Sequence, residues 1–155
     1  MYSRILVATD GSPTSDLAIE QAARLAQDQH AQLRIVHVIE QSRLAFAAAG
    51  PVAIDLEAIL KALRKSGQEA LDRGRAIAKQ YGVDADAAII GDDAVDDRVA
   101  MVLAEEARRW KADLIVLGTH GRRGINHLLM GSVAEAVARV APVHVLLIRA
   151  RPAQA

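Results

Sequence analysis

The chain has 155 residues, of which 52% are hydrophobic and 25% are charged, a composition that predicts one ordinary globular domain. Its 19 basic and 19 acidic residues balance, and only 3% of its residues are aromatic, so the composition argues against a nucleic-acid-binding protein. The chain has no cysteine, which excludes disulfides, thiolate catalysis and zinc–thiolate sites.

Short apolar segments alternate with helical patterns along the chain. Five segments predict strands, at residues 4–9, 33–39, 85–90, 114–117 and 143–148. Four helices are predicted between them: one starts at Ser12-Pro13, one is capped by Asp55 and continues to Tyr81, and the others cover 95–110 and 133–140.

Strands that are apolar on both faces and alternate with helices indicate a parallel sheet covered on both sides. We therefore expect an α/β fold, a single-domain Rossmann-like sandwich. Its five-stranded parallel sheet should have the order 3-2-1-4-5, with helices on both faces. The domain should cover residues 1–150, and residues 151–155 should form a polar tail.

Two features between the second and third strands have structural interpretations. The connection at 40–54 contains an apolar segment from Leu44 to Ala49, which is either a short helical turn packed on the core or a lid for a partner or ligand. In the helix that follows, Gly67 and Gly74 lie on the apolar face. We interpret them as points of close packing against the sheet, because glycine is otherwise unfavourable in a helix.

Unusual sequences follow the first and fourth strands. Thr9-Asp10-Gly11-Ser12 follows one, and Gly118-Thr119-His120-Gly121 follows the other, with Gly131-Ser132 nine residues later at the start of a helix. In parallel α/β sheets, ligands bind outside the carboxyl ends of the strands at the point where the strand order reverses. Glycines and a helix N-terminus at such a place are typical of a phosphate-binding loop.

The standard nucleotide motifs are absent: no lysine precedes Ser132 as a P-loop requires, and no G-x-G-x-x-G follows the first strand. The G-x-x-G-x9-G-S spacing, with Asp10 after the first strand, instead closely resembles the universal stress protein family. The resemblance covers nearly the whole chain, including Ile35-Val36-His37-Val38 and the segment that begins at Pro142.

The resemblance is to the ATP-binding members of this family, and it implies an adenine nucleotide as the ligand: ATP, or AMP or ADP, with Mg²⁺ accompanying ATP. It implies that Asp10 contacts the ribose or adenine side and that Val38 lines the adenine slot. It further implies that Gly118 and Gly121 let the backbone approach the nucleotide, and that Gly131, Ser132 and Val133 hold the phosphates. The chain matches the family pattern at each of these positions.

Neighbouring residues complete the predicted site. Leu117 would be a second aliphatic wall for adenine, and Thr9 belongs to the turn that carries Asp10. Arg122 would add positive charge, as would Arg123, and His120 lies within the glycine loop, where it would reach a phosphate. The histidines show no H-x-x-x-H spacing, so no metal site is expected.

Simpler interpretations remain open for the same residues. Gly118 and Gly121 would then be ordinary turn glycines, and Arg122 and Arg123 would be solvated loop charges. Asp10 would then only cap the first helix.

Ser132 and Glu135 also fit an S-x-x-E capping box. The Ser132 hydroxyl would serve the helix when the site is empty and a phosphate when it is filled.

The last strand predicts self-association. The segment from Val143 to Ile148 is apolar on both faces, yet the topology places it at a sheet edge, where unpaired strands risk aggregation. Pairing with the same strand of a second copy would solve this problem, and family members commonly dimerise there. We expect a homodimer. We also expect a cytoplasmic protein without membrane or nucleic-acid partners, because no apolar segment reaches the length of a membrane helix.

These observations favour an ATP-binding, homodimeric stress-response regulator whose nucleotide occupancy modulates its conformation or its binding to an unknown protein partner. No catalytic residues are predicted, because no nucleophile–base pair or carboxylate pair is visible. Two alternatives remain: a slow ATP hydrolase or autophosphorylating enzyme with Ser132 or His120 as acceptor, and a nucleotide-free interaction protein.

Overall fold

The computed structural model describes residues 1–39, 55–91, 99–119 and 131–149. Its strands are β1 (Arg4–Ala8), β2 (Gln32–Val38), β3 (Asp86–Ile90), β4 (Leu114–Gly118) and β5 (His144–Ile148). Its helices are α1 (Pro13–Gln29), α3 (Leu56–Gln80), α4 (Val99–Trp110) and α5 (Ser132–Val140). The apolar segment at 44–49 and the expected start of a helix at Val95 lie outside the described residues.

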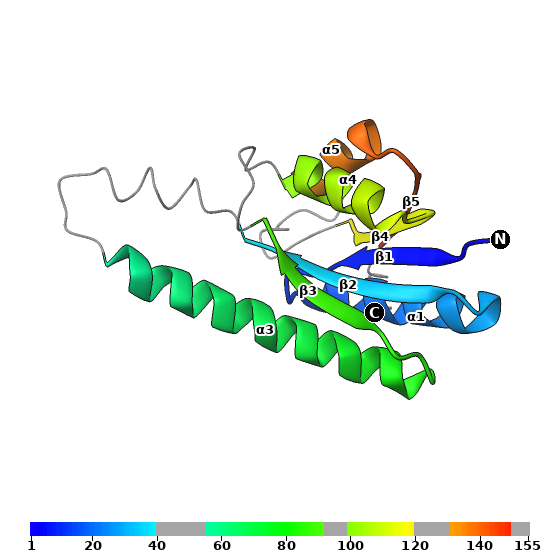
Figure 1. The fold of residues 1–155 in the computed structure, drawn as a ribbon, viewed down its shortest axis with the longest axis horizontal. Helices are drawn as coiled ribbons and strands as arrows, with labels where there is room; N and C mark the ends of the chain where they lie inside the picture. Colours follow the sequence, from blue (N-terminus) through cyan, green and yellow to red (C-terminus); the bar gives the residue numbers. More distant parts are fainter. Residues whose placement is uncertain (40–54, 92–98, 120–130, 150–155) are drawn as a thin grey trace, which may run out of the picture.

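The strands form one parallel sheet with the order β3-β2-β1-β4-β5, as the sequence predicts. Helices α1 and α3 cover one face, and α4 and α5 cover the other (Figure 1). The fold is therefore the expected three-layer sandwich. The predicted strand ends differ from the observed ones by about one residue, which is the usual uncertainty of a boundary.

Alternating side chains of the central strands build two separate cores. In β1, Ile5 and Val7 face α1 and α3, whereas Leu6 lies in the cluster under α4 and α5. All three are fully buried. This two-sided burial explains why the central strands are continuous apolar runs.

The two glycines of α3 allow this long helix to lie close to the sheet, as expected. A Cβ atom on Gly74 would lie 3.0 Å from Ile19 Cδ1 of α1 and 3.2 Å from Ile35 Cδ1 of β2. A Cβ atom on Gly67 would lie only 2.6 Å from the ring of His37. Gly67 and Gly74 therefore have a packing role that offsets their cost of roughly 1 kcal/mol each in a helix.

A charged cluster joins β2 to α4 at the end of the sheet where the strands begin. Glu106 is 5% exposed, and its Oε1 atom lies 2.9 Å from Nε of Arg34, although the two groups are not aligned for a hydrogen bond. Arg34 also pairs with Asp86, and Arg109 pairs with Glu106. The guanidinium of Arg34 lies 6.0 Å from the ring centre of Trp110, so the cluster also includes a cation–π contact.

The N-terminus is fixed at the same end by Asp113. Its Oδ2 atom accepts hydrogen bonds from the backbone N–H groups of Ser3, at 2.7 Å, and Arg4, at 2.8 Å. These two bonds favour the ionised carboxylate and hold the pKa of Asp113 below its ordinary value.

We predict that Asp113→Ala lowers the melting temperature at pH 7 by about 2–4 °C, the shift that corresponds to roughly 1 kcal/mol in a domain of this size. Because the folded-state pKa is depressed, the carboxylate stabilises the fold above its ordinary pKa of about 3.9. That contribution is lost as the pH falls through the folded-state value. The difference between variant and wild type should thus shrink below pH 4 in thermal scans followed by circular dichroism.

The exposed loop residue Asp84 provides the control, since Asp84→Ala should change the melting temperature little at either pH. A difference for Asp113→Ala that is the same at pH 3 and pH 7 would contradict the role of the charge.

Candidate functional site

The site lies where the strand order reverses, between β1 and β4 in the middle of the sheet. Ile5 pairs with Leu114 and Val7 with Val116, so both strands end at the same edge. The sequences that follow them are therefore neighbours in space although more than 100 residues separate them. This is the position at which open parallel sheets bind ligands.

The two ends of the glycine loop meet beside this edge. The N–H of Gly131 donates to the carbonyl oxygen of Thr119 at 2.7 Å, and the N–H of Thr119 donates to Ile148 of β5 at 2.8 Å. These bonds place the N-terminus of α5 directly after β4. The described parts of the G-x-x-G-x9-G-S pattern, Gly118-Thr119 and Gly131-Ser132, thus lie together.

The capping box predicted for α5 is wrong. Gly131 is the N-cap, with φ −61° and ψ 146°, and no side chain of the described residues caps the helix. Ser132 is already the first helical residue and is exposed, so its hydroxyl is one position too far along to cap. Glu135 instead forms an ion pair with Arg139 at 2.6 Å. The first turn of α5 therefore has the positive end of the helix dipole and no side-chain cap.

The turn between β1 and α1 is held by its own side chains. Thr9 is 4% exposed, and its hydroxyl lies 3.0 Å from the Ser15 hydroxyl and accepts from the N–H of Gly11 at 3.1 Å. Asp10 Oδ1 accepts from the N–H of Ser12 at 3.0 Å. The Thr9 side chain therefore maintains the turn, and at the predicted site it supports the segment that carries Asp10.

Asp10 does not cap the first helix, so this simpler interpretation is wrong. Ser12 is the N-cap of α1, and its hydroxyl accepts from the N–H of Ser15 at 3.2 Å. Pro13 occupies the first helical position and thereby fixes the cap on the residue before it. Asp10 lies two residues earlier, at the carboxyl end of β1, where the sequence predicts it to meet the ligand.

The predicted adenine walls lie on the face covered by α4 and α5. Val38 ends β2 and is half-buried against the core of that face, so part of its side chain remains accessible. Leu117 is only 4% exposed and belongs mainly to the core. Val133, in the first turn of α5, is 40% exposed. Val38 is thus the better placed of the two aliphatic walls.

Gly118 has a structural role that the sequence does not reveal. A Cβ atom there would lie 2.9 Å from Thr14 Cγ2 and 3.2 Å from the Thr14 backbone, so the first turn of α1 packs directly on this glycine. Its φ is not in the left-handed region, which leaves close packing as the reason for glycine. A packing requirement therefore accounts for this glycine without a ligand.

Two residues missed by the sequence analysis support the β1–α1 turn from outside. Arg73 of α3 donates to the carbonyl oxygen of Gly11 at 2.8 Å and pairs with Asp16 of α1 at 3.0 Å. His37 Nδ1 lies 2.9 Å from the carbonyl oxygen of Thr9. The only sequence signal for either residue is the position of His37, which stands beside Val38 at the end of the second strand.

Three predicted site residues, His120, Gly121 and Arg122, lie outside the described residues, as does Arg123. In the described parts of the chain, no group of three or more His, Asp or Glu side chains could hold a metal ion. None of the described helices is long and apolar enough to cross a membrane.

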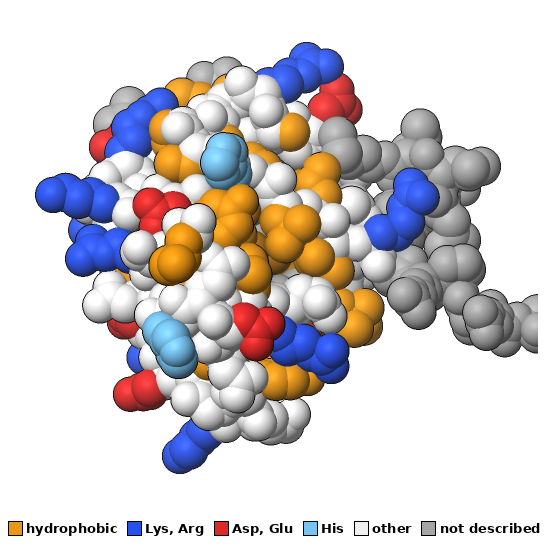
Figure 2. Space-filling view, turned by 90° about the vertical axis from the view of Figure 1, so that its right-hand side faces the viewer, with side chains coloured by type: hydrophobic (Ala, Val, Ile, Leu, Met, Phe, Trp, Pro, Cys, Tyr) orange, Lys and Arg blue, Asp and Glu red, His pale blue; other side chains and the backbone are white. Residues whose placement is uncertain are grey.

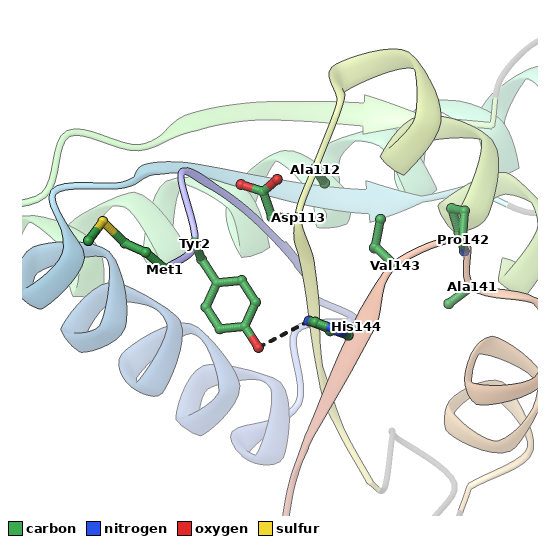
Figure 3. A pocket seen from close by; sticks show the side chains of 8 residues that line it. All are labelled: Met1, Tyr2, Ala112, Asp113, Ala141, Pro142, Val143 and His144. Carbon is green, nitrogen blue, oxygen red and sulfur yellow. Dashed lines mark hydrogen bonds between the residues drawn. The ribbon is translucent and has the colours of Figure 1, made fainter.

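A hollow lies at the opposite end of the sheet from the predicted site, where the strands begin. It is an open depression of about 630 Å³ whose lining includes Tyr2, Asp113, Pro142 and His144 (Figure 3). Hydrophobic side chains gather near the centre of this face (Figure 2). The Asp113 carboxylate is already used by the N-terminal backbone, and no predicted site residue lies here. This hollow is not the predicted site.

The fold and the site together define a class: a doubly wound parallel α/β domain with a glycine-containing loop and a helix N-terminus at its switch point. The family model described as the universal stress protein family matches residues 1–149. The chain belongs to this family.

Comparisons with curated relatives and solved structures agree with this family assignment. Universal stress protein A homolog 2 of Coxiella burnetii is 37% identical over 150 residues, which cover 96% of this chain and 95% of the relative. A crystal structure of a family member from Burkholderia pseudomallei is 35% identical, with a TM-score of 0.76 and coverage of 96% and 97%. A universal stress protein crystallised in complex with cAMP is 27% identical, with a TM-score of 0.69 and coverage of 95% and 97%.

We predict that Gly118→Ala destabilises the ligand-free protein by about 1–3 kcal/mol, the usual cost of overpacking. The added methyl group must displace the first turn of α1, including its backbone. Urea unfolding without nucleotide measures the effect. Adding Thr14→Ser removes the nearest atom and should restore part of the loss. A variant as stable as wild type would mean that packing does not require this glycine.

Proposed function

We propose that this protein binds an adenine nucleotide at the switch point of its sheet, and that occupancy modulates its conformation or its binding to a partner. The observation that carries the proposal is the hydrogen bond from Gly131 to Thr119, which sets the N-terminus of α5, with glycine as its N-cap, at the carboxyl end of β4. On the other side of the switch point, Asp10 lies two residues after the end of β1, and Val38 is the last residue of β2.

The chemistry of these groups suits a nucleotide. Backbone N–H groups and the positive end of α5 would attract phosphates, while Val38 would contact the base and Asp10 the ribose or base. The helix dipole contributes only about 0.3–1 kcal/mol, whereas micromolar affinity needs about 8 kcal/mol. Charge-assisted hydrogen bonds, worth roughly 1.5–3 kcal/mol each, would supply much of the remainder.

One comparison further supports an adenine nucleotide as the ligand class. The related structure that was crystallised with cAMP has the same fold at 27% identity. Mg²⁺ would accompany ATP without a dedicated protein site, because Mg²⁺ is commonly held by phosphate oxygens and water.

We predict that Gly131→Val weakens ATP binding at least tenfold in isothermal titration calorimetry. The backbone angles of Gly131, φ −61° and ψ 146°, suit valine, so the substitution tests the space in front of α5 rather than backbone strain. A tenfold loss corresponds to about 1.4 kcal/mol.

Titrations of wild type with ATP, AMP and GTP should show micromolar binding of the adenine nucleotides. Ala138→Val, on the exposed face of the same helix, is the matched control and should bind as wild type does. Equal ATP affinity of wild type and Gly131→Val would refute the phosphate site.

We also propose that the protein is a homodimer that pairs through β5. This strand is the sheet edge next to β4, its segment is apolar on both faces, and Leu146 is 37% exposed. Such an edge leaves backbone groups and apolar side chains in water, and pairing around a two-fold axis would cover both.

Sedimentation of wild type at micromolar concentration should give a species of twice 16.6 kDa. Leu146→Lys should shift the equilibrium toward the monomer, because it would bring two like charges together across the axis. The exposed α1 residue Leu17 supplies a comparison, Leu17→Lys. A folded wild-type monomer would exclude the dimer.

A further inference from the structure

The backbone of Thr9, the last residue before Asp10, is held on both sides by β2. Its N–H donates to the carbonyl oxygen of Val36 at 2.9 Å, which extends the β1–β2 ladder by one residue. Its carbonyl oxygen lies 2.9 Å from His37 Nδ1. Because a carbonyl only accepts, Nδ1 carries the proton in this bond.

The His37 ring is in turn positioned by α3. A Cβ atom on Gly67 would lie 2.6 Å from Cδ2 of the ring and 3.1 Å from Nε2, so the ring fills the space that the missing side chain leaves. Helix α3 reaches the same turn a second time, through the bond from Arg73 to the Gly11 carbonyl oxygen at 2.8 Å. The turn that carries Asp10 is therefore fixed from β2 and α3.

We propose that His37 is a positioning residue for the nucleotide site: it sets the direction in which the chain leaves β1 and thereby places Asp10. The inference rests on the proposed function, which uses Asp10 but assigns nothing to His37. Since Asp10 would contact the ribose or adenine part, a displaced turn should weaken ATP and AMP by similar factors. Damage to the phosphate site would affect ATP more.

Two substitutions of His37 separate its hydrogen bond from its bulk. His37→Leu fills the space but has no donor, whereas His37→Asn puts an amide N–H at the position of Nδ1. We expect His37→Leu to weaken ATP and AMP binding roughly threefold to tenfold, the range for one lost hydrogen bond. His37→Asn should remain within about twofold of wild type.

Gly67→Ala tests the same contact from α3. Alanine favours a helix more than glycine does, so the helix itself should not suffer. The new methyl group would nevertheless push the ring away from Thr9, and binding should fall as in His37→Leu.

Ile35→Val is the matched control for stability. Ile35 is fully buried on the same face of β2, two residues before His37, and contacts the other helix glycine, Gly74. Ile35→Val should destabilise the fold without touching the turn, and it should therefore leave nucleotide affinity unchanged. If His37 contributed only to stability, His37→Leu would likewise leave the affinity unchanged.

Hydrogen exchange of the ligand-free protein provides a readout that does not depend on nucleotide. The amides of Gly11, Ser12, Thr14 and Ser15 should exchange faster in His37→Leu and Gly67→Ala, and at the wild-type rate in His37→Asn and Ile35→Val. Unchanged exchange in His37→Leu would overturn the inference, as would unchanged nucleotide affinity. A wild-type protein that binds no adenine nucleotide would refute the proposed function, and the exchange rates would still decide whether His37 orders the turn.

Discussion

The parallel pairing of β1 with β4 is the constraint on which the rest of this structure depends. It joins two halves of the chain whose strands otherwise pair with their sequence neighbours, so it creates the switch point. Because parallel strands end at a common edge, this pairing alone brings the Asp10 turn and the glycine loop together. Apart from Ala8, which is partly buried, the apolar side chains of these two strands are fully or almost fully buried on both faces. The large burial free energy of the core therefore also fixes the geometry of the site.

The two walls of the site are built by different means. On the β4 side, backbone hydrogen bonds from Thr119 and Gly131 set the start of α5, whose N-cap is a glycine and so has no capping side chain of its own. On the β1 side, hydroxyl and carboxylate groups of Thr9, Asp10 and Ser12 satisfy the turn. One wall therefore offers backbone donors toward an anion, while the other uses its polar side chains largely on itself.

The sequence predicted the fold almost completely, because strands buried on both faces leave long apolar runs and because glycines follow the first and fourth strands. It correctly predicted Asp55 as the cap of α3, but it left the cap of α1 open and misplaced the cap of α5. Asp10 and Ser12 are both good caps, and only the position of Pro13 decides between them; at α5 the backbone turns at Gly131, one residue before the apparent capping box.

The partners of closely packed glycines were not predicted either. The sequence indicated that Gly67 packs on the sheet, but not that it meets His37, nor that Gly118 meets Thr14, because these pairings depend on how the helices lie on the sheet.

The self-satisfied turn after β1 has a thermodynamic consequence. A loop that becomes ordered only when its ligand arrives must give up conformational entropy at that moment, and the loss reduces affinity. Here the ordering cost of the turn is met during folding, by buried hydroxyls and by contacts from α3. This wall would already be ordered before a ligand arrives, so binding would lose no conformational entropy in the turn. Any entropic penalty that regulates occupancy would then have to arise elsewhere in the chain.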